Sequence, residues 1–361
     1  MGLTPSAAAA VPTRLHGGVD AAGAAQFDFS TNSNAVGPCP EVVAALQQTD
    51  AARYPDPAYP ALRERLAAWH GVAPARLVLA ASASEFIFRF TAWMVQQGAR
   101  RVWMPQHAYG DYAAAAQAWD LATVVQPAQA QLAWACDPSS PLGQDHLEWA
   151  GLPFVFPSQA AMPAGPVWVL DRAYAPLRLS GQPALTATQL DSVWQLLTPN
   201  KALGLTGVRA AYAIAPNSPE GLAAVSGLGR LCPSWPVGSH GVSLLQAWTT
   251  SSVQQWLAHS LDTLREWKLR QWALCEAMGW LCVPSHANFF VAQPQPMPGA
   301  DESLGASATA MPERLAALRG FGVKLRDAAS FGLPGRVRLA VLPPPAQDVL
   351  AQAWPRAAGV L

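Results

Sequence analysis

The sequence carries little charge, and the charge that it has is balanced. Only 13% of the 361 residues are charged, with 23 basic and 23 acidic side chains. A chain of zero formal net charge offers no electrostatic footprint for nucleic acid or for an anionic membrane. We therefore expect neither partner, and any anion that the protein binds must be held by a few placed groups.

Cysteine is scarce, and long apolar runs are absent. Five cysteines, an odd number, lie far apart without a CxxC pair; they are Cys39, Cys136, Cys232, Cys275 and Cys282. This spacing argues against a disulfide framework and against a zinc site, so we predict no metal. No apolar run reaches the length of a membrane span, and no basic residue precedes the short N-terminal apolar patch. We expect a soluble cytoplasmic protein without a secretory signal.

Apolar residues, in contrast, make up 51% of the chain, which indicates extensive burial and argues against disorder. At this length we expect a large domain accompanied by a smaller one. The sequence divides into an N-terminal arm at 1–40, a large domain at 41–240 and a small C-terminal domain at 241–361.

Strands and helices alternate through the large domain. Helices are predicted at 41–48, 62–70, 85–97 and 112–119, and strands at 76–80, 101–104, 121–125, 131–136, 167–170, 192–197 and 208–213. Continuous apolar strands separated by helices indicate a mostly parallel sheet of seven strands that is covered on both faces. The predicted fold class is therefore α/β.

The last third of the chain has a different character. Residues 244–278 have the spacing of one long amphipathic helix. After it we expect strands at 288–292, 323–326 and 336–342, helices at 312–319 and at the C-terminus, and a loop at 293–312. These elements predict a small α+β domain.

One segment combines a lysine with small and apolar neighbours and an arginine. Lys201 stands eight positions before Arg209 in a stretch that begins at Thr198. Burial lowers the pKa of a lysine and frees its amine for Schiff-base chemistry, while the arginine can hold an anion. The alternative is a surface lysine in a glycine-rich turn.

The strand predicted at 167–170 ends in Asp171, and Tyr174 follows it. The carboxyl ends of such strands are where α/β sheets bind their ligands. The order Asp171, Tyr174, Lys201, Arg209 resembles that of the fold type I pyridoxal-phosphate enzymes, the aspartate aminotransferase superfamily. The resemblance implies that Asp171 pairs with the pyridine nitrogen of pyridoxal 5'-phosphate, Lys201 with its aldehyde, Tyr174 with its ring oxygen and Arg209 with its phosphate.

The resemblance extends to further cofactor contacts. Ser82, Ala83 and Ser84 stand before a predicted helix, where backbone N–H groups can cradle the phosphate. The alternative is an ordinary serine N-cap with Glu85 in the first helical turn. Tyr109 would stack on the pyridine ring, whereas the tyrosine three residues later is interpreted as packing.

The sequence also departs from the family pattern. Ser140 stands where the family has an asparagine that binds the cofactor's ring oxygen, which shifts that contact toward Tyr174. Arg172 and Asn200 replace residues that are common in relatives, and Thr198 is a candidate phosphate contact. These departures suggest one alternative of another class, a cofactor-free binding protein that has lost its activity.

Three segments narrow the resemblance. They are His16-Gly-Gly18 with residues 28–38, the Tyr-Pro pair at Tyr54, and residues 326–333 shortly before Arg338. Together they look like the threonine-phosphate decarboxylases of cobalamin biosynthesis, close relatives of the histidinol-phosphate aminotransferases. This implies decarboxylation of L-threonine O-3-phosphate to (R)-1-aminopropan-2-yl phosphate, and the alternative is an aminotransferase of the histidinol-phosphate type.

The same resemblance implies how a small phosphorylated amino acid is bound. His16 and Arg326 would contact the substrate phosphate, Asn34 would lie near the substrate, and Arg338 would bind the α-carboxylate. Tyr54 would reach the cofactor phosphate of a neighbouring subunit, so we expect a homodimer.

Overall fold

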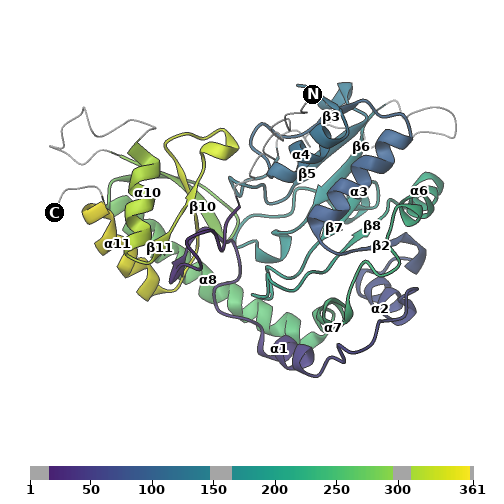
Figure 1. The fold of residues 1–361 in the computed structure, drawn as a ribbon, viewed down its shortest axis with the longest axis horizontal. Coiled ribbons are helices and arrows are strands. Elements are labelled where there is room, and N and C mark those ends of the chain that lie inside the picture. Colours follow the sequence, from purple (N-terminus) through teal and green to yellow (C-terminus); the bar gives the residue numbers. More distant parts are fainter. Residues whose placement is uncertain (1–15, 147–164, 296–309, 358–361) are drawn as a thin grey trace, which may run out of the picture.

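The computed structural model describes residues 16–146, 165–295 and 310–357. Two bodies lie side by side, a large one built on a seven-stranded sheet and a small one built on a four-stranded sheet (Figure 1). The long helix α8 (Ser251–Ala277) runs from one body to the other. Within these residues, no helix is both long and apolar enough to cross a membrane.

The large sheet has the order β2-β8-β7-β6-β5-β3-β4, and all of its strands are parallel except β8, which is antiparallel to both neighbours. The strands are β2 (Leu77–Ala80), β3 (Arg101–Trp103), β4 (Ala122–Thr123), β5 (Leu132–Cys136), β6 (Val167–Asp171), β7 (Trp194–Leu197) and β8 (Ala211–Ile214). Each overlaps one of the seven predicted strands. The predicted mostly parallel sheet is confirmed.

The central strands of the sheet are mostly apolar and buried on both faces, whereas the edge strand β4 is exposed and β3 begins at the exposed Arg101. Strands β2, β5, β7 and β8 are buried along their whole length, as expected for a sheet between two helical layers. Alternate residues of β8 point to opposite faces. Ala213 joins the cluster formed with α3 (Ala83–Gln96), α4 (Gly110–Ala118) and α6 (Pro219–Arg230), and Tyr212 joins the cluster on the other face.

The second cluster contains α1 (Pro40–Gln47), α2 (Pro60–His70), α7 (Ser239–Trp248) and the first half of α8. Helix α7 begins at Ser239, spans the boundary predicted at 240 and 241, and packs on α1 and α2. The division of the chain at 240 and 241 stays a prediction.

The small body holds an antiparallel sheet of order β12-β13-β10-β9. Its strands are β9 (Trp280–Val283), β10 (Phe289–Pro294), β12 (Arg326–Asp327) and β13 (Val337–Ala340), and α10 (Ala310–Gly320) and α11 (Pro344–Ala357) pack beside it. The arm adds β1 (Phe27–Asp28) parallel to β11 (Val323–Lys324). The arm around β1 therefore packs with the small body, whereas Asn34 and Cys39 donate backbone hydrogen bonds to Lys201 and Leu203 of the large body.

Two expectations about the last third were wrong. The single helix predicted at 244–278 is two helices, because Thr250 accepts a hydrogen bond from the backbone N–H of Val253 and caps a new helix there. The single strand predicted at 323–326 is two short strands that pair with different partners, β11 with β1 and β12 with β13. Most of the loop predicted at 293–312 lies outside the described residues.

Candidate active site

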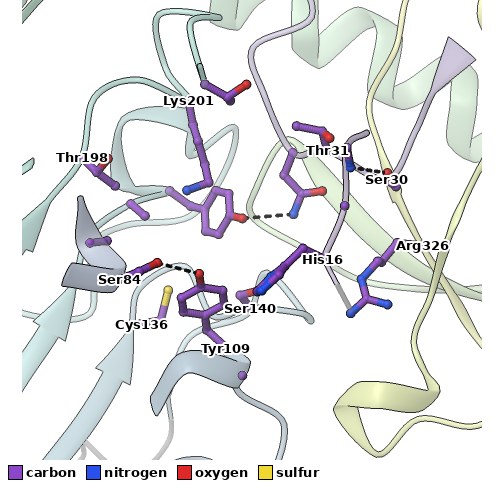
Figure 2. A pocket seen from close by; sticks show the side chains of 18 of the residues that line it. His16, Ser30, Thr31, Ser84, Tyr109, Cys136, Ser140, Thr198, Lys201 and Arg326 are labelled. Carbon is purple, nitrogen blue, oxygen red and sulfur yellow. Dashed lines mark hydrogen bonds between the residues drawn. The ribbon is translucent and has the colours of Figure 1, made fainter. Parts of the chain in front are cut away.

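A cavity of about 580 Å³ lies where the carboxyl ends of the parallel strands face the small body. The three predicted catalytic residues, Asp171, Tyr174 and Lys201, all line it. In Figure 2 the Lys201 and Thr198 side chains lie on one side of the cavity and Arg326 on the other, with His16 between them. The cavity therefore joins residues from the arm, the large sheet and the small sheet.

Asp171 is the last residue of β6 and is only 4% exposed. Its Oδ2 accepts a hydrogen bond from the Tyr112 hydroxyl at 2.8 Å, and its Oδ1 accepts one from the Ala173 backbone N–H at 2.9 Å. Burial raises the pKa of this carboxyl, although Tyr112 and the nearby Lys201 lower it. The Asp171 carboxyl therefore lies at the cavity wall with a neutral hydrogen-bond donor on each oxygen. A cationic group of a ligand could pair with it there.

Tyr112 was interpreted as packing, and the structure shows a further contact. Its ring is buried and stacks on Trp134 with the ring centroids 5.0 Å apart, which aims the hydroxyl at Asp171. The available signal was its spacing, because residues three apart in a helical turn share one face. Tyr109 and Tyr112 both occur at the start of α4 and meet edge to face at 5.7 Å.

Lys201 follows β7, and its Nζ lies 5.4 Å from the ring centroid of Tyr174. Tyr174 is 8% exposed, and its hydroxyl accepts a hydrogen bond from Asn32 Nδ2 at 3.4 Å. Thr198 and Arg209, from the same segment, also line the cavity, and the Thr198 hydroxyl donates to Asn200 Oδ1 at 2.8 Å. The segment from Thr198 to Arg209 thus wraps one end of the cavity.

The N-terminus of α3 opens on the same end. Ala83 and Ser84, its first two residues, line the cavity. The Ser82 side chain instead accepts a hydrogen bond from the Glu85 backbone N–H at 3.0 Å, so the N-cap interpretation of this serine is confirmed. A helix N-terminus of this kind carries partial positive charge and free N–H groups, which suits a phosphate.

Tyr109 presents its ring to the cavity. Its hydroxyl donates to Asp111 Oδ2 at 2.8 Å and lies 3.1 Å from the Ser84 hydroxyl. Burial and the Asp111 carboxylate together raise the pKa of this phenol, so it stays neutral. A neutral aromatic ring fixed at its far end provides a flat surface for a planar ligand.

Two arginines define the other end of the cavity. Arg338 is 7% exposed, and it donates to the Ser30 carbonyl at 3.1 Å and to the Ser140 hydroxyl at 3.5 Å. Arg326 donates to the Ser330 hydroxyl at 2.7 Å and to the Asp327 carbonyl at 2.9 Å. Burial lowers the pKa of Arg338, and burial together with Arg338 lowers the pKa of Arg326 to about 10, so both remain cations at neutral pH.

The arm places His16 at the mouth, where its ring centroid lies 6.3 Å from that of Tyr109. Gly17 permits this path, because a Cβ atom there would lie 2.1 Å from the Ser30 carbonyl oxygen. Asp20 ties the arm to the small body through ion pairs with Lys324 and Arg319, and the Lys324 hydrogen bond lowers the Asp20 pKa to about 2.

Two residues predicted for this chain's own site, Asn34 and Ser82, do not line the cavity, and neither does Tyr54, which was predicted to reach the site of a neighbouring subunit. Asn34 is buried elsewhere, where its amide donates to the Ala202 carbonyl at 3.0 Å and the Ser260 hydroxyl at 2.7 Å. Tyr54 is 80% exposed and stacks on Trp235, and Ser82 serves as the helix cap. The nearby Asn32, which the sequence interpretation missed, lines the cavity instead.

The cavity suits pyridoxal phosphate by its polar groups. A carboxyl at Asp171, an amine at Lys201 and a helix N-terminus with Arg209 match the pyridine nitrogen, the aldehyde and the phosphate. Within the described residues, Asn32 Oδ1 and Arg338 Nε are buried at this cavity without hydrogen-bond partners. Buried polar atoms of this kind require a ligand or water, so the residues fit a bound polar group.

Comparison with known proteins places the chain in one family. The family model for aminotransferase class I and II matches residues 24–143 and 165–353, and the chain belongs to this family. The fold is that of the fold type I pyridoxal-phosphate enzymes, as the sequence predicts.

Individual relatives are more distant. The histidinol-phosphate aminotransferase of Hyphomonas neptunium is 26% identical over 357 residues, which cover 91% of this chain and 88% of that protein. The crystal structure of histidinol-phosphate aminotransferase from Sinorhizobium meliloti with pyridoxal-5'-phosphate superposes with a TM-score of 0.74 at 19% identity, covering 91% and 90% of the two chains. L-threonine-O-3-phosphate decarboxylase from Porphyromonas gingivalis gives a TM-score of 0.67 at 16% identity, covering 90% and 97%.

Proposed function

We propose that the protein binds pyridoxal 5'-phosphate and acts at the carbon that bears the amino group of a small phosphorylated amino compound. The observation that carries the proposal is one cavity lined by Asp171, Lys201, Arg326 and Arg338. The first pair matches the cofactor, and the second pair supplies two cations for anionic groups of a substrate.

The protein's own residues then have distinct tasks. When bound, the cofactor supplies an electron sink for the bond that breaks at the substrate Cα. Asp171 would keep the pyridine nitrogen protonated, and Lys201 would return a proton to Cα as general acid. Arg338 would hold the substrate carboxylate and Arg326, with His16 at the mouth, the phosphate.

For the reaction we propose decarboxylation of L-threonine O-3-phosphate to (R)-1-aminopropan-2-yl phosphate. Arg326 and Arg338 are direct partners in the register of β12 and β13, and both line the cavity. A substrate that carries a phosphate and a carboxylate on one molecule would neutralise both cations together. The Cα–carboxylate bond breaks, carbon dioxide leaves, and a proton from Lys201 takes its place on Cα.

The second candidate is an aminotransferase of the histidinol-phosphate type. The named relatives support it, since the Hyphomonas neptunium protein covers most of this chain. Histidinol phosphate has no carboxylate, so Arg338 would act in the half-reaction of an amino acid donor such as glutamate.

One assay separates the two reactions. The purified protein is supplied with pyridoxal phosphate and given either O-phospho-L-threonine alone or histidinol phosphate with 2-oxoglutarate. Carbon dioxide release without use of a keto acid supports decarboxylation, and glutamate formation supports aminotransfer. If neither product forms and borohydride reduction adds no mass to Lys201, the result would support the alternative of a cofactor-free binding protein.

We also propose a homodimer in which Tyr54 completes the partner's site. The Tyr54 side chain is 80% exposed and stacks on Trp235 at 4.5 Å outside the cavity of its own chain. Light scattering of the purified protein gives the oligomeric state. In a dimer of this kind Tyr54→Ala weakens cofactor binding, whereas a monomer of full activity excludes the proposal.

A further inference from the structure

The two arginines at the substrate end share one aromatic ring. The guanidinium carbon of Arg326 lies 4.8 Å from the ring centroid of Phe331, and that of Arg338 lies 5.3 Å from it. All three side chains line the cavity. A cation within about 6 Å of a ring face is attracted by its negative quadrupole. Phe331 therefore contacts both cations that the proposed function assigns to the substrate.

The strand register explains why such a ring is needed. Arg326 and Arg338 are directly opposite each other in the antiparallel pair of β12 and β13. Opposed residues point to the same face of a sheet, with Cβ atoms about 4.5–5.5 Å apart, and like charges at such positions repel. Burial, and after it the repulsion from Arg338, lowers the pKa of Arg326. An aromatic ring in contact with both groups offsets part of that cost.

Phe331 itself is fixed from both bodies. It ends the 3-10 turn η5 (Ala329–Phe331) and packs on a small apolar cluster of Val291, Ala328 and Leu333. Its carbonyl oxygen lies 2.7 Å from Nδ1 of His107, in the loop that leads to α4. Since a carbonyl only accepts, His107 donates from Nδ1 in this contact. The ring therefore has little freedom to move away from the arginines.

We propose that Phe331 is a specificity-determining residue that holds the Arg326 and Arg338 guanidinium groups at a fixed separation. Held in this way, the pair selects small compounds with a phosphate and a carboxylate over compounds with a phosphate alone. A ligand with one anion leaves one of two neighbouring cations unneutralised, which weakens its binding. The inference rests on the proposed function and names what sets its substrate class.

The test compares two ligands that lack an amine and therefore do not react. 3-Phosphoglycerate carries a phosphate and a carboxylate, and glycerol 3-phosphate replaces the carboxylate with a hydroxymethyl group. Their dissociation constants are measured by calorimetry on the cofactor-loaded protein. For the unaltered protein we expect 3-phosphoglycerate to bind more tightly than glycerol 3-phosphate.

Phe331→Leu removes the ring face and keeps an apolar side chain. We expect the ratio of the two dissociation constants to fall about tenfold, because the two guanidinium groups lose the contact that fixes their separation. Phe331→Tyr keeps the ring and should keep the ratio. Phe321→Leu is a matched control, because the Phe321 ring lies 4.6 Å from the guanidinium carbon of Arg356 and is not part of the cavity lining. Phe331→Met replaces the leucine variant if that variant does not fold.

Each result has a distinct meaning. An unchanged ratio in a folded Phe331→Leu protein, or an equal fall in Phe321→Leu, overturns the inference and leaves the proposed function standing. Equal binding of the two ligands to the unaltered protein also overturns it. If the unaltered protein binds neither phosphate compound, the proposed function fails and the inference fails with it.

Discussion

The two ends of the cavity are built in different ways. The cofactor end comes from one continuous sheet edge, where Asp171 closes β6 and Lys201 follows β7. The substrate end is assembled from the two ends of the chain, with His16 from the arm and Arg326 and Arg338 from the small sheet. In the proposed function, the cofactor chemistry therefore depends on one sheet edge, and substrate selectivity depends on segments that other parts of the fold bring together.

The two ends of the cavity also differ in their charged groups. At the cofactor end Asp171 has neutral donors on both oxygens, so its charge is positioned but not neutralised. At the substrate end two cations face each other beside one ring. We therefore expect substitutions at the first end to remove turnover and substitutions at the second to change substrate affinity.

The largest effect is expected for Lys201→Ala. Loss of the only proposed proton donor at Cα should lower turnover by at least about 10⁴-fold, beyond the usual range of acid–base catalysis because the covalent cofactor link is lost too. The measurement is product formation per enzyme, together with mass spectrometry after borohydride treatment. A variant that keeps even a tenth of the activity would remove Lys201 from the site.

Asp171→Asn should lower turnover by about 10²–10³-fold while making the cofactor-free protein more stable. The folded-state pKa of Asp171 is raised, so the folded protein binds this proton more tightly than the unfolded chain does. Stability from this group is therefore lost as the pH rises from 3.8 through the raised pKa, and it stays lost at neutral pH. Calorimetry at pH 7 should show a melting temperature higher by about 2 °C or more, and a lower one would contradict the assignment.

Arg338→Gln should weaken binding of the substrate. Loss of a charge-assisted pair to the substrate carboxylate is worth about 3 kcal/mol, or about 100-fold in kcat/KM. Binding of the cofactor, measured by its absorbance, should be unchanged because Arg338 belongs to the other end. Equal losses in cofactor binding and in kcat/KM would show that the two ends are not separable.

The smallest effects are expected for a matched pair in the arm. Asn32→Ala should raise KM about tenfold, since Asn32 lines the cavity, with little change in melting temperature. Asn34→Ala should leave KM unchanged and cost about 1–3 kcal/mol of stability, because its buried amide bonds the Ala202 carbonyl and Ser260. The opposite pattern would restore Asn34 as the substrate contact.

Local patterns predicted much of the fold. Most strands of the large sheet were recognisable because a strand buried on both faces is a nearly continuous apolar run. The split of α7 and α8 was not, because Thr249 and Thr250 interrupt a helical spacing that continues on both sides. A threonine side chain caps a helix only when the chain turns there, which spacing does not reveal.

The sequence by itself determined the family, the sheet and the order of Asp171, Tyr174, Lys201 and Arg209 along it, since these depend on short-range patterns. Tertiary structure alone decided which polar residues meet the cavity: Asn32 reaches it while Asn34 does not, and Tyr112 bonds Asp171. It also decided that Phe331 contacts both arginines. The physical reason is that these contacts join irregular or distant segments, whose side-chain directions follow from packing and not from any period in the sequence.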